Sequence, residues 1–117
     1  MSPWAENLMR SLDGRATMVE TDLGPVQVAR EGDGPRVLSI HGSPGGFDQG
    51  LVWAQRLRTG GCQLIAPSRP GYLRTPLDSG RSPSEQADLY ASMLDALHID
   101  KVTILGISSG GPSAVHF

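Results

Sequence analysis

The stretch KVTILGISSGG, residues 101–111, decides which fold this chain can have. Its first five residues are rich in β-branched side chains, which indicates a buried strand. The motif G-x-S-x-G follows at once, with Ser108 at its centre and Gly106 and Gly110 on either side. This pattern is typical of a nucleophile elbow, a strand-to-helix turn that holds a serine in a strained backbone geometry with its hydroxyl exposed. Because a turn rich in glycine and serine can match the motif by chance, the rest of the chain must support this interpretation.

The composition is typical of one soluble globular domain, since the chain has 117 residues, of which 38% are hydrophobic and 19% charged. Its net charge of -2 gives no electrostatic reason to expect nucleic acid or an anionic membrane as a partner. The N-terminus has no basic region followed by an apolar run, and no apolar run is long enough to span a membrane, so we expect a cytoplasmic protein. The single cysteine, Cys62, excludes an internal disulfide and a cysteine-based metal cluster.

Segments that precede the elbow alternate between strands and helices. Periodicity and turn residues predict a helix over 3–13, a hairpin over 16–21 and 25–30, strands over 36–40 and 62–66, and helices over 48–58 and 82–97. The last helix has the clearest start, because Ser82 and Glu85 have the spacing of a capping box. In the helix over 48–58, the apolar spacing predicts one face against the sheet, and we expect Trp53 to pack there.

A sheet of this kind places its binding loops at one edge. Strands that alternate with helices imply right-handed crossovers and a parallel sheet, in which the loops at the carboxyl ends of the strands lie side by side. Glycine-rich loops follow the three predicted parallel strands, and we expect them to surround a single crevice. The chain then divides into an N-terminal arm, 1–15, and a domain, 16–117, that ends just after the elbow.

The three loop motifs together resemble the N-terminal half of an α/β hydrolase. They are HGSPGG over 41–46, RPGY over 69–72 and GISSGG over 106–111. The resemblance covers residues 16–117 and implies an α/β fold in which an antiparallel hairpin is followed by parallel strands with crossover helices. In that family the first motif is the oxyanion loop. The resemblance therefore implies that Ser43 N–H is one oxyanion donor and that Ser109 N–H, directly after the nucleophile Ser108, is the other.

Other residues of the first and third loops have structural interpretations. Gly42, Gly106 and Gly110 are expected to shape the turns that hold the reacting groups. His41 belongs to the oxyanion loop, where a histidine more often hydrogen-bonds to backbone than acts as a base. We therefore expect His41 to hold the turn.

The second loop has two candidates for contact with substrate, Arg69 and Tyr72. An arginine that braces its own loop explains Arg69 equally well. Leu73 follows where many members of the family have glycine, which is a departure from the family pattern.

We expect this chain to supply the nucleophile and oxyanion hole of a serine hydrolase that acts on small carboxylic esters or related acyl compounds, without metal or organic cofactor. Dehalogenases and epoxide hydrolases, the relatives with a carboxylate nucleophile, carry aspartate where this chain has Ser108. Hydrolases similar to prolyl aminopeptidases share the HG-x-PGG loop and are an alternative. Their elbow usually has an aromatic residue at the position of Ser109.

The general base and the acid of such an enzyme are not evident in the sequence. In this family they follow the nucleophile, yet only nine residues follow Ser108 and none is acidic. His116 is expected about 12 Å along the next helix, and His98 at the opposite edge of the sheet. We therefore expect an incomplete hydrolase, inactive alone, whose C-terminal half is supplied in cis or as a second chain. The alternative is a truncated or split, non-catalytic piece that binds a ligand or a partner chain.

Overall fold

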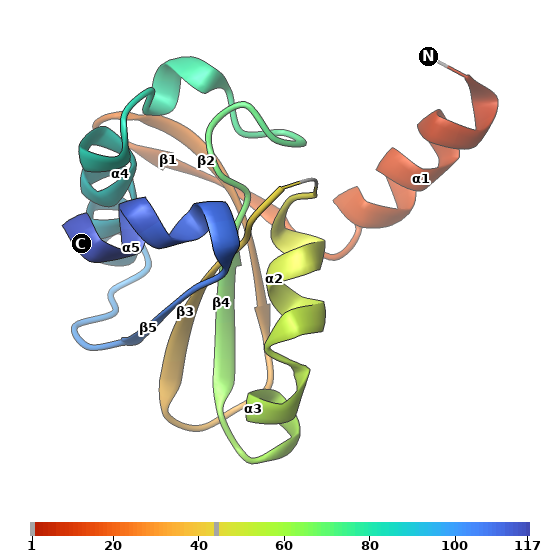
Figure 1. The fold of residues 1–117 in the computed structure, drawn as a ribbon. Coiled ribbons are helices and arrows are strands. Elements are labelled where there is room, and N and C mark those ends of the chain that lie inside the picture. The colour runs from red at the N-terminus through yellow and green to blue at the C-terminus, as the bar shows by residue number, and fades with distance from the viewer. Residues whose placement is uncertain (1, 44) are drawn as a thin grey trace.

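A five-stranded sheet in the order β1-β2-β4-β3-β5 forms the centre of the computed structural model, which describes residues 2–43 and 45–117 and, for Ser109, the backbone alone. The hairpin of β1 and β2 is antiparallel, β2 runs antiparallel to β4, and β4, β3 and β5 are parallel (Figure 1). The strands are β1 (Thr17–Thr21), β2 (Gly24–Glu31), β3 (Arg36–Ile40), β4 (Gln63–Pro67) and β5 (Thr103–Gly106). The α/β architecture predicted from the sequence is confirmed. Met1 of the predicted arm and Pro44 of the predicted oxyanion loop lie outside the described residues.

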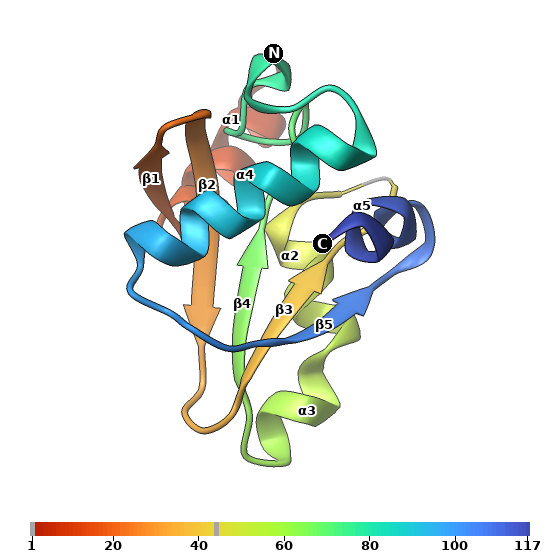
Figure 2. The same cartoon turned by 90° about the vertical axis from the view of Figure 1, so that its left-hand side faces the viewer.

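Helices cover both faces of the sheet. In Figures 1 and 2, α2 and α3 lie on one face, α4 and α5 lie on the other, and α1 extends away from the sheet. The helices are α1 (Pro3–Asp13), α2 (Phe47–Trp53), α3 (Gln55–Thr59), α4 (Pro83–Ala96) and α5 (Gly111–His116), with short 3-10 turns at Leu77–Ser79 and Ser108–Gly110. None of the helices in the described ranges is both long and apolar enough to cross a membrane.

Local capping explains where two of the helices begin. Before α1, the Ser2 hydroxyl accepts a hydrogen bond from Ala5 N–H at 3.2 Å. Before α4, Ser82 Oγ accepts from Glu85 N–H at 3.1 Å, and Glu85 Oε1 accepts from Ser82 N–H at 3.0 Å. The capping box predicted from the sequence is therefore confirmed, and it satisfies two backbone donors that the helix leaves without an internal partner.

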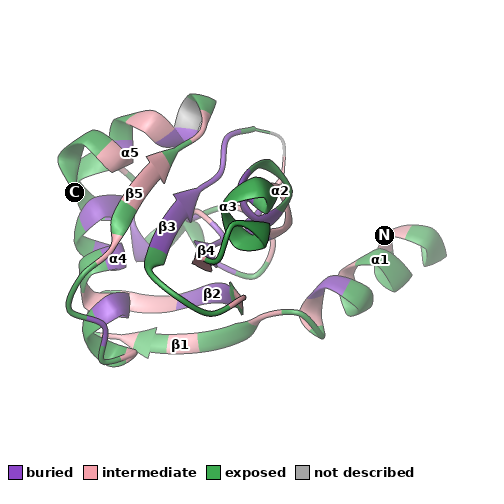
Figure 3. Cartoon of the chain, turned by 90° about the horizontal axis from the view of Figure 1, so that it is seen from below, coloured by how far each residue is buried: buried purple, intermediate pink, exposed green. Residues whose placement is uncertain are grey.

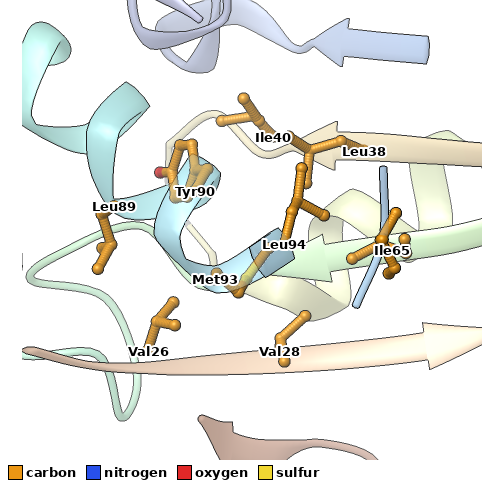
Figure 4. Packing of buried hydrophobic residues seen from close by; sticks show 10 residues of the cluster. Val26, Val28, Leu38, Ile40, Ile65, Leu89, Tyr90, Met93 and Leu94 are labelled. Atoms are coloured by element: carbon orange, nitrogen blue, oxygen red, sulfur yellow. The ribbon is translucent and has the colours of Figure 1, made fainter. Parts of the chain in front are cut away.

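The core consists of two apolar clusters, one on each face of the sheet. The cluster under α4 is shown in Figure 4, where Tyr90, Met93 and Leu94 face side chains of β2, β3 and β4. The cluster under α2 contains Phe47 and Leu51 against residues of the same strands. Because successive side chains of a strand point to opposite faces, a central strand buried on both faces is apolar almost throughout. This explains the burial of β3 from Val37 to Ile40, which Figure 3 shows in purple.

Two expectations for the first crossover helix are wrong. The predicted helix over 48–58 is broken at Ala54 into α2 and α3, and Leu57 is exposed rather than packed on the sheet. Leu51 and Ala54 are both buried, but the chain ends α2 at Trp53 and begins α3 at Gln55, so Leu57 does not continue their face. Trp53 does not pack against the sheet, since 68% of its surface is exposed.

Strand β5 is an edge of the sheet. It pairs with β3, and its central residues, Ile104 and Leu105, are half-buried, whereas Thr103 is exposed. The sequence of this segment is typical of a strand buried on both faces, but β5 lies at the edge of the sheet and in the described residues its side chains are at most half-buried. Its carboxyl end delivers the chain into the elbow.

Candidate functional site

Ser108 occupies the turn between β5 and α5 with a positive φ of 50°. This left-handed backbone conformation is rare for a residue with a side chain and costs roughly 1–2 kcal/mol. The surrounding structure maintains it, because Gly110 N–H donates to Ile107 O at 2.8 Å and Ile107 N–H donates to Ile40 O at 2.9 Å. Ser108 itself is exposed. The local geometry is thus that of a strained turn that presents a serine to solvent.

The two glycines of the motif are required by close packing. A Cβ atom on Gly110 would lie 2.5 Å from the carbonyl oxygen of His41, and one on Gly106 would lie 2.8 Å from Cβ of Ala114. Real Cβ atoms do not approach other atoms so closely. The contact with His41 also places the elbow directly against the start of the loop that follows β3.

His41 is fully buried and both of its ring nitrogens are engaged. Nδ1 lies 2.6 Å from the carbonyl oxygen of Gly42, and Nε2 accepts a hydrogen bond from Arg69 N–H at 2.8 Å. These partners define the neutral tautomer in which Nδ1 carries the proton and donates to Gly42. The pKa of His41 lies below its usual 6.5, and burial of the ring is the largest cause of this shift. A neutral ring with both nitrogens occupied holds the loop and is not available to accept a proton from Ser108.

Arg69 and Tyr72 join the second loop to the first. The Tyr72 hydroxyl forms a short hydrogen bond with Ser43 Oγ, and its ring meets that of His41 edge to face at 4.9 Å between centroids. The Arg69 guanidinium lies 5.2 Å from the centre of the Tyr72 ring, and its Nη1 donates to His41 O at 3.4 Å. The structure therefore brings His41, Ser43, Arg69 and Tyr72 together, and Arg69 braces the loops as its alternative interpretation required.

Leu73 adopts a φ of 47°, the left-handed conformation that favours glycine. Its side chain packs on the start of α2, because a Cβ atom on Gly46 would come within 2.6 Å of Leu73 Cγ. The departure from the family pattern therefore leaves the turn in a glycine-like conformation. The apolar contact with Gly46 occupies the space that a larger residue at position 46 would need.

Sequence reasoning missed two polar residues that support the loops. Gln49 Oε1 accepts a hydrogen bond from Gly42 N–H at 2.7 Å. Ser68, which is fully buried, accepts from Phe47 N–H at 3.1 Å through its hydroxyl. Gln49 carries no sequence signal, since a glutamine in a helix is ordinarily solvated. Ser68 directly follows an apolar strand, a position at which a polar residue can be suspected of a role at the sheet edge.

The other two histidines lie outside the loops of this arrangement. His98 is exposed in the turn after α4, and so precedes β5, whereas Ser108 follows it. His116 is exposed at the end of α5. Among the histidines of the described ranges, His41 alone contacts the loops of the site.

Comparison with known proteins finds chains that are similar to most of this sequence. The hydrolase YcgS of Bacillus subtilis (strain 168), an uncharacterized protein, is 32% identical over 103 residues, which are 88% of this chain and 36% of that protein. An α/β-hydrolase fold protein from Nakamurella multipartita superimposes with a TM-score of 0.81 and 47% identity, over 85% of this chain and 34% of that one. The esterase EaEST from Exiguobacterium antarcticum superimposes with a TM-score of 0.69 and 25% identity, over 85% of this chain and 38% of that one.

No model of a protein family matches the sequence. The chain spans about a third of the length of the relatives that it matches.

Proposed function

This chain belongs to the α/β-hydrolase fold family, and on that premise we propose that it supplies the nucleophile and the oxyanion hole of a serine hydrolase acting on carboxylic esters or related acyl compounds. The observation that carries the proposal is the backbone of Ser108, which is held at a φ of 50° in a turn packed against the His41 carbonyl. Strain of this kind is retained where the surroundings enforce it, and it is concentrated at functional sites. The hydrolase relatives support the general class of reaction.

The proposed reaction uses an acyl-enzyme. Ser108 Oγ attacks the acyl carbon while a histidine accepts its proton, and the carbonyl oxygen becomes an oxyanion that Ser43 N–H and Ser109 N–H stabilise. Collapse of this intermediate expels the alcohol, which takes the proton back from the histidine. Water then attacks the acyl group by the same route and releases the acid and free Ser108.

We propose that the histidine and its acidic partner come from outside these residues, in cis or from a second chain. Both ring nitrogens of His41 are occupied, and His98 and His116 lie on other parts of the surface. A serine hydroxyl without a base is a poor nucleophile at neutral pH. The relatives are about 2.5 times as long as this chain, which is consistent with a contribution from a further segment.

Tyr72 is proposed to contact substrate together with Ser43. Its hydroxyl bonds to Ser43 Oγ, which belongs to the same residue as one proposed oxyanion donor. A polar group of the substrate that displaces or extends this hydrogen bond would lie beside the reacting carbonyl. Arg69 contributes indirectly, because its guanidinium is engaged with His41 O and the Tyr72 ring.

Labelling with a fluorophosphonate tests the proposal. A hydrolase containing this chain should be labelled at Ser108, and Ser108→Ala should abolish both labelling and ester hydrolysis. Ser109→Ala is the matched control, since it removes a neighbouring hydroxyl but leaves the backbone N–H in place. Absence of label at Ser108, under conditions that label an ordinary esterase, would favour the alternative of a non-catalytic piece that binds a ligand or partner chain.

Hydrolysis of a proline anilide in preference to p-nitrophenyl acetate would favour the aminopeptidase-like alternative. We also propose a cytoplasmic location, which rests on the sequence alone.

A further inference from the structure

The side chain of Gln49 contacts the oxyanion loop at two points. Its Oε1 accepts a hydrogen bond from Gly42 N–H at 2.7 Å. A Cβ atom on Gly45, whose φ is 142°, would lie 3.0 Å from Gln49 Cβ and 3.4 Å from its Nε2, so the two residues are packed together. One contact precedes Ser43 in the chain and the other follows it.

The helix that carries Gln49 is itself attached to the sheet. Phe47 N–H donates to Ser68 Oγ at 3.1 Å, and Ser39 Oγ donates to Gly50 O at 2.8 Å. A Cβ atom on Gly50 would lie 3.1 Å from Ser39 O, which shows how closely α2 approaches β3. Because these attachments lie on both sides of Gln49, its amide is placed relative to the strand from which the loop starts.

We infer that Gln49 is a positioning residue that sets the direction of Ser43 N–H. The peptide unit bearing that N–H follows Gly42, and glycine allows its backbone an unusually wide range of rotation. The contact of Gly42 O with His41 Nδ1 holds one side of this residue, and the hydrogen bond from Gly42 N–H to Gln49 holds the other and removes part of the remaining freedom. Oxyanion donors act by being oriented before the charge develops, so a loop that must first order itself stabilises the transition state less. The inference rests on the proposed function, because the direction of Ser43 N–H matters only if an oxyanion forms there.

Three variants test the inference. Gln49→Met keeps the length of the side chain and removes the strong acceptor, whereas Gln49→Glu keeps an acceptor oxygen. Gln63→Met is the matched control, since it removes a glutamine that accepts from Arg36 Nε at 3.2 Å on β4, away from the loop. Each variant is made in the hydrolase containing this chain. The exchange rate of the Gly42 amide and the kcat and KM for p-nitrophenyl acetate are measured.

We expect Gln49→Met to speed exchange at Gly42 by about tenfold or more, because a buried donor loses its acceptor. The same variant should lower kcat by about 10- to 100-fold, less than the loss of an entire oxyanion donor, with little change in KM. In Gln49→Glu, the exchange rate of the Gly42 amide and kcat should both stay close to those of the parent protein. Gln63→Met should change neither the exchange rate nor kcat.

Unchanged exchange at Gly42 in Gln49→Met would overturn the inference whether or not the protein hydrolyses esters. Faster exchange with an unchanged kcat, in a protein that Ser108→Ala inactivates, would also overturn it while leaving the proposed nucleophile in place. Failure of the proposed function has a different signature, since activity would then survive Ser108→Ala.

Discussion

The backbone N–H of Arg69 donates a hydrogen bond to Nε2 of His41 over 2.8 Å and joins the loop after β4 to the loop after β3. The other ring nitrogen, Nδ1, faces Gly42 O at 2.6 Å, so the neutral ring satisfies a donor and an acceptor at once. A protonated ring would carry hydrogen on Nε2 and direct it at the Arg69 N–H. Protonation of His41 therefore requires this junction to open.

The first prediction concerns the dependence of stability on pH. Burial lowers the pKa of His41 in the folded protein, so as the pH falls below 6.5 the unfolded chain takes up a proton that the folded protein does not. The free energy of unfolding should therefore decrease by up to about 1.4 kcal/mol per pH unit, until the pH reaches the lowered pKa. Above the pKa of His41 in the unfolded chain, the ring is neutral in both states. There the free energy of unfolding no longer depends on pH through this residue.

Denaturant unfolding between pH 7.5 and 5 checks this. His41→Asn should lower stability at neutral pH but flatten the decline with falling pH. His98→Asn, at an exposed histidine with a φ of 59°, should keep the decline of the parent protein. If the free energy of unfolding fell equally steeply with pH in the parent protein and in His41→Asn, the assignment of a buried neutral ring would be contradicted.

The second prediction compares neighbouring glycines of the elbow. Gly110→Ala places a Cβ 2.5 Å from His41 O and should destabilise the fold by about 2–3 kcal/mol, as overpacking does. Gly111→Ala should change stability by less than about 0.5 kcal/mol, because a Cβ there meets nothing within 4 Å and its φ of -56° suits any residue. Thermal or denaturant midpoints of the two variants measure the difference. Similar midpoints would mean that the turn does not pack against the loop after β3.

The third prediction separates strain from chemistry at Ser108. Ser108→Ala and Ser108→Gly should both lose ester hydrolysis. Ser108→Gly should nevertheless be more stable than Ser108→Ala by up to about 1 kcal/mol, since glycine tolerates the φ of 50°. Denaturant midpoints decide the matter, and a more stable alanine variant would show that this backbone is not strained.

The fourth prediction is that the 117-residue chain alone is inactive and either associated or poorly folded. Its β5 edge carries Ile104 and Leu105 only half-buried, and an unpaired apolar edge favours association. Activity toward p-nitrophenyl acetate should emerge when a C-terminal half is supplied in cis or in trans. A monodisperse monomer with turnover that depends on Ser108 would contradict this, and sedimentation together with initial rates would reveal it.

Local patterns in the sequence were enough to predict most of the fold. Alternation, apolar runs and turn residues located the strands, and the spacing of Ser82 and Glu85 located the start of α4, because all of these depend on residues close together in the chain. The spacing of Gly106 and Gly110 likewise located the turn around Ser108, although the close approach of Gly110 to His41 O joins residues far apart in the chain. The break at Ala54 escaped prediction, since Ala54 is neither glycine nor proline and gives no local signal that a helix ends there.

Only the tertiary structure decided how the loops of the site hold one another. The sequence identified His41 as part of a loop, but its neutral state depends on Arg69, 28 residues away, and on burial that no local pattern encodes. Gln49 resembles any solvated helical glutamine until the fold brings Gly42 within 2.7 Å. Hydrogen bonds between residues distant in sequence depend on the positions of whole strands, and those positions are set by the packing of the core.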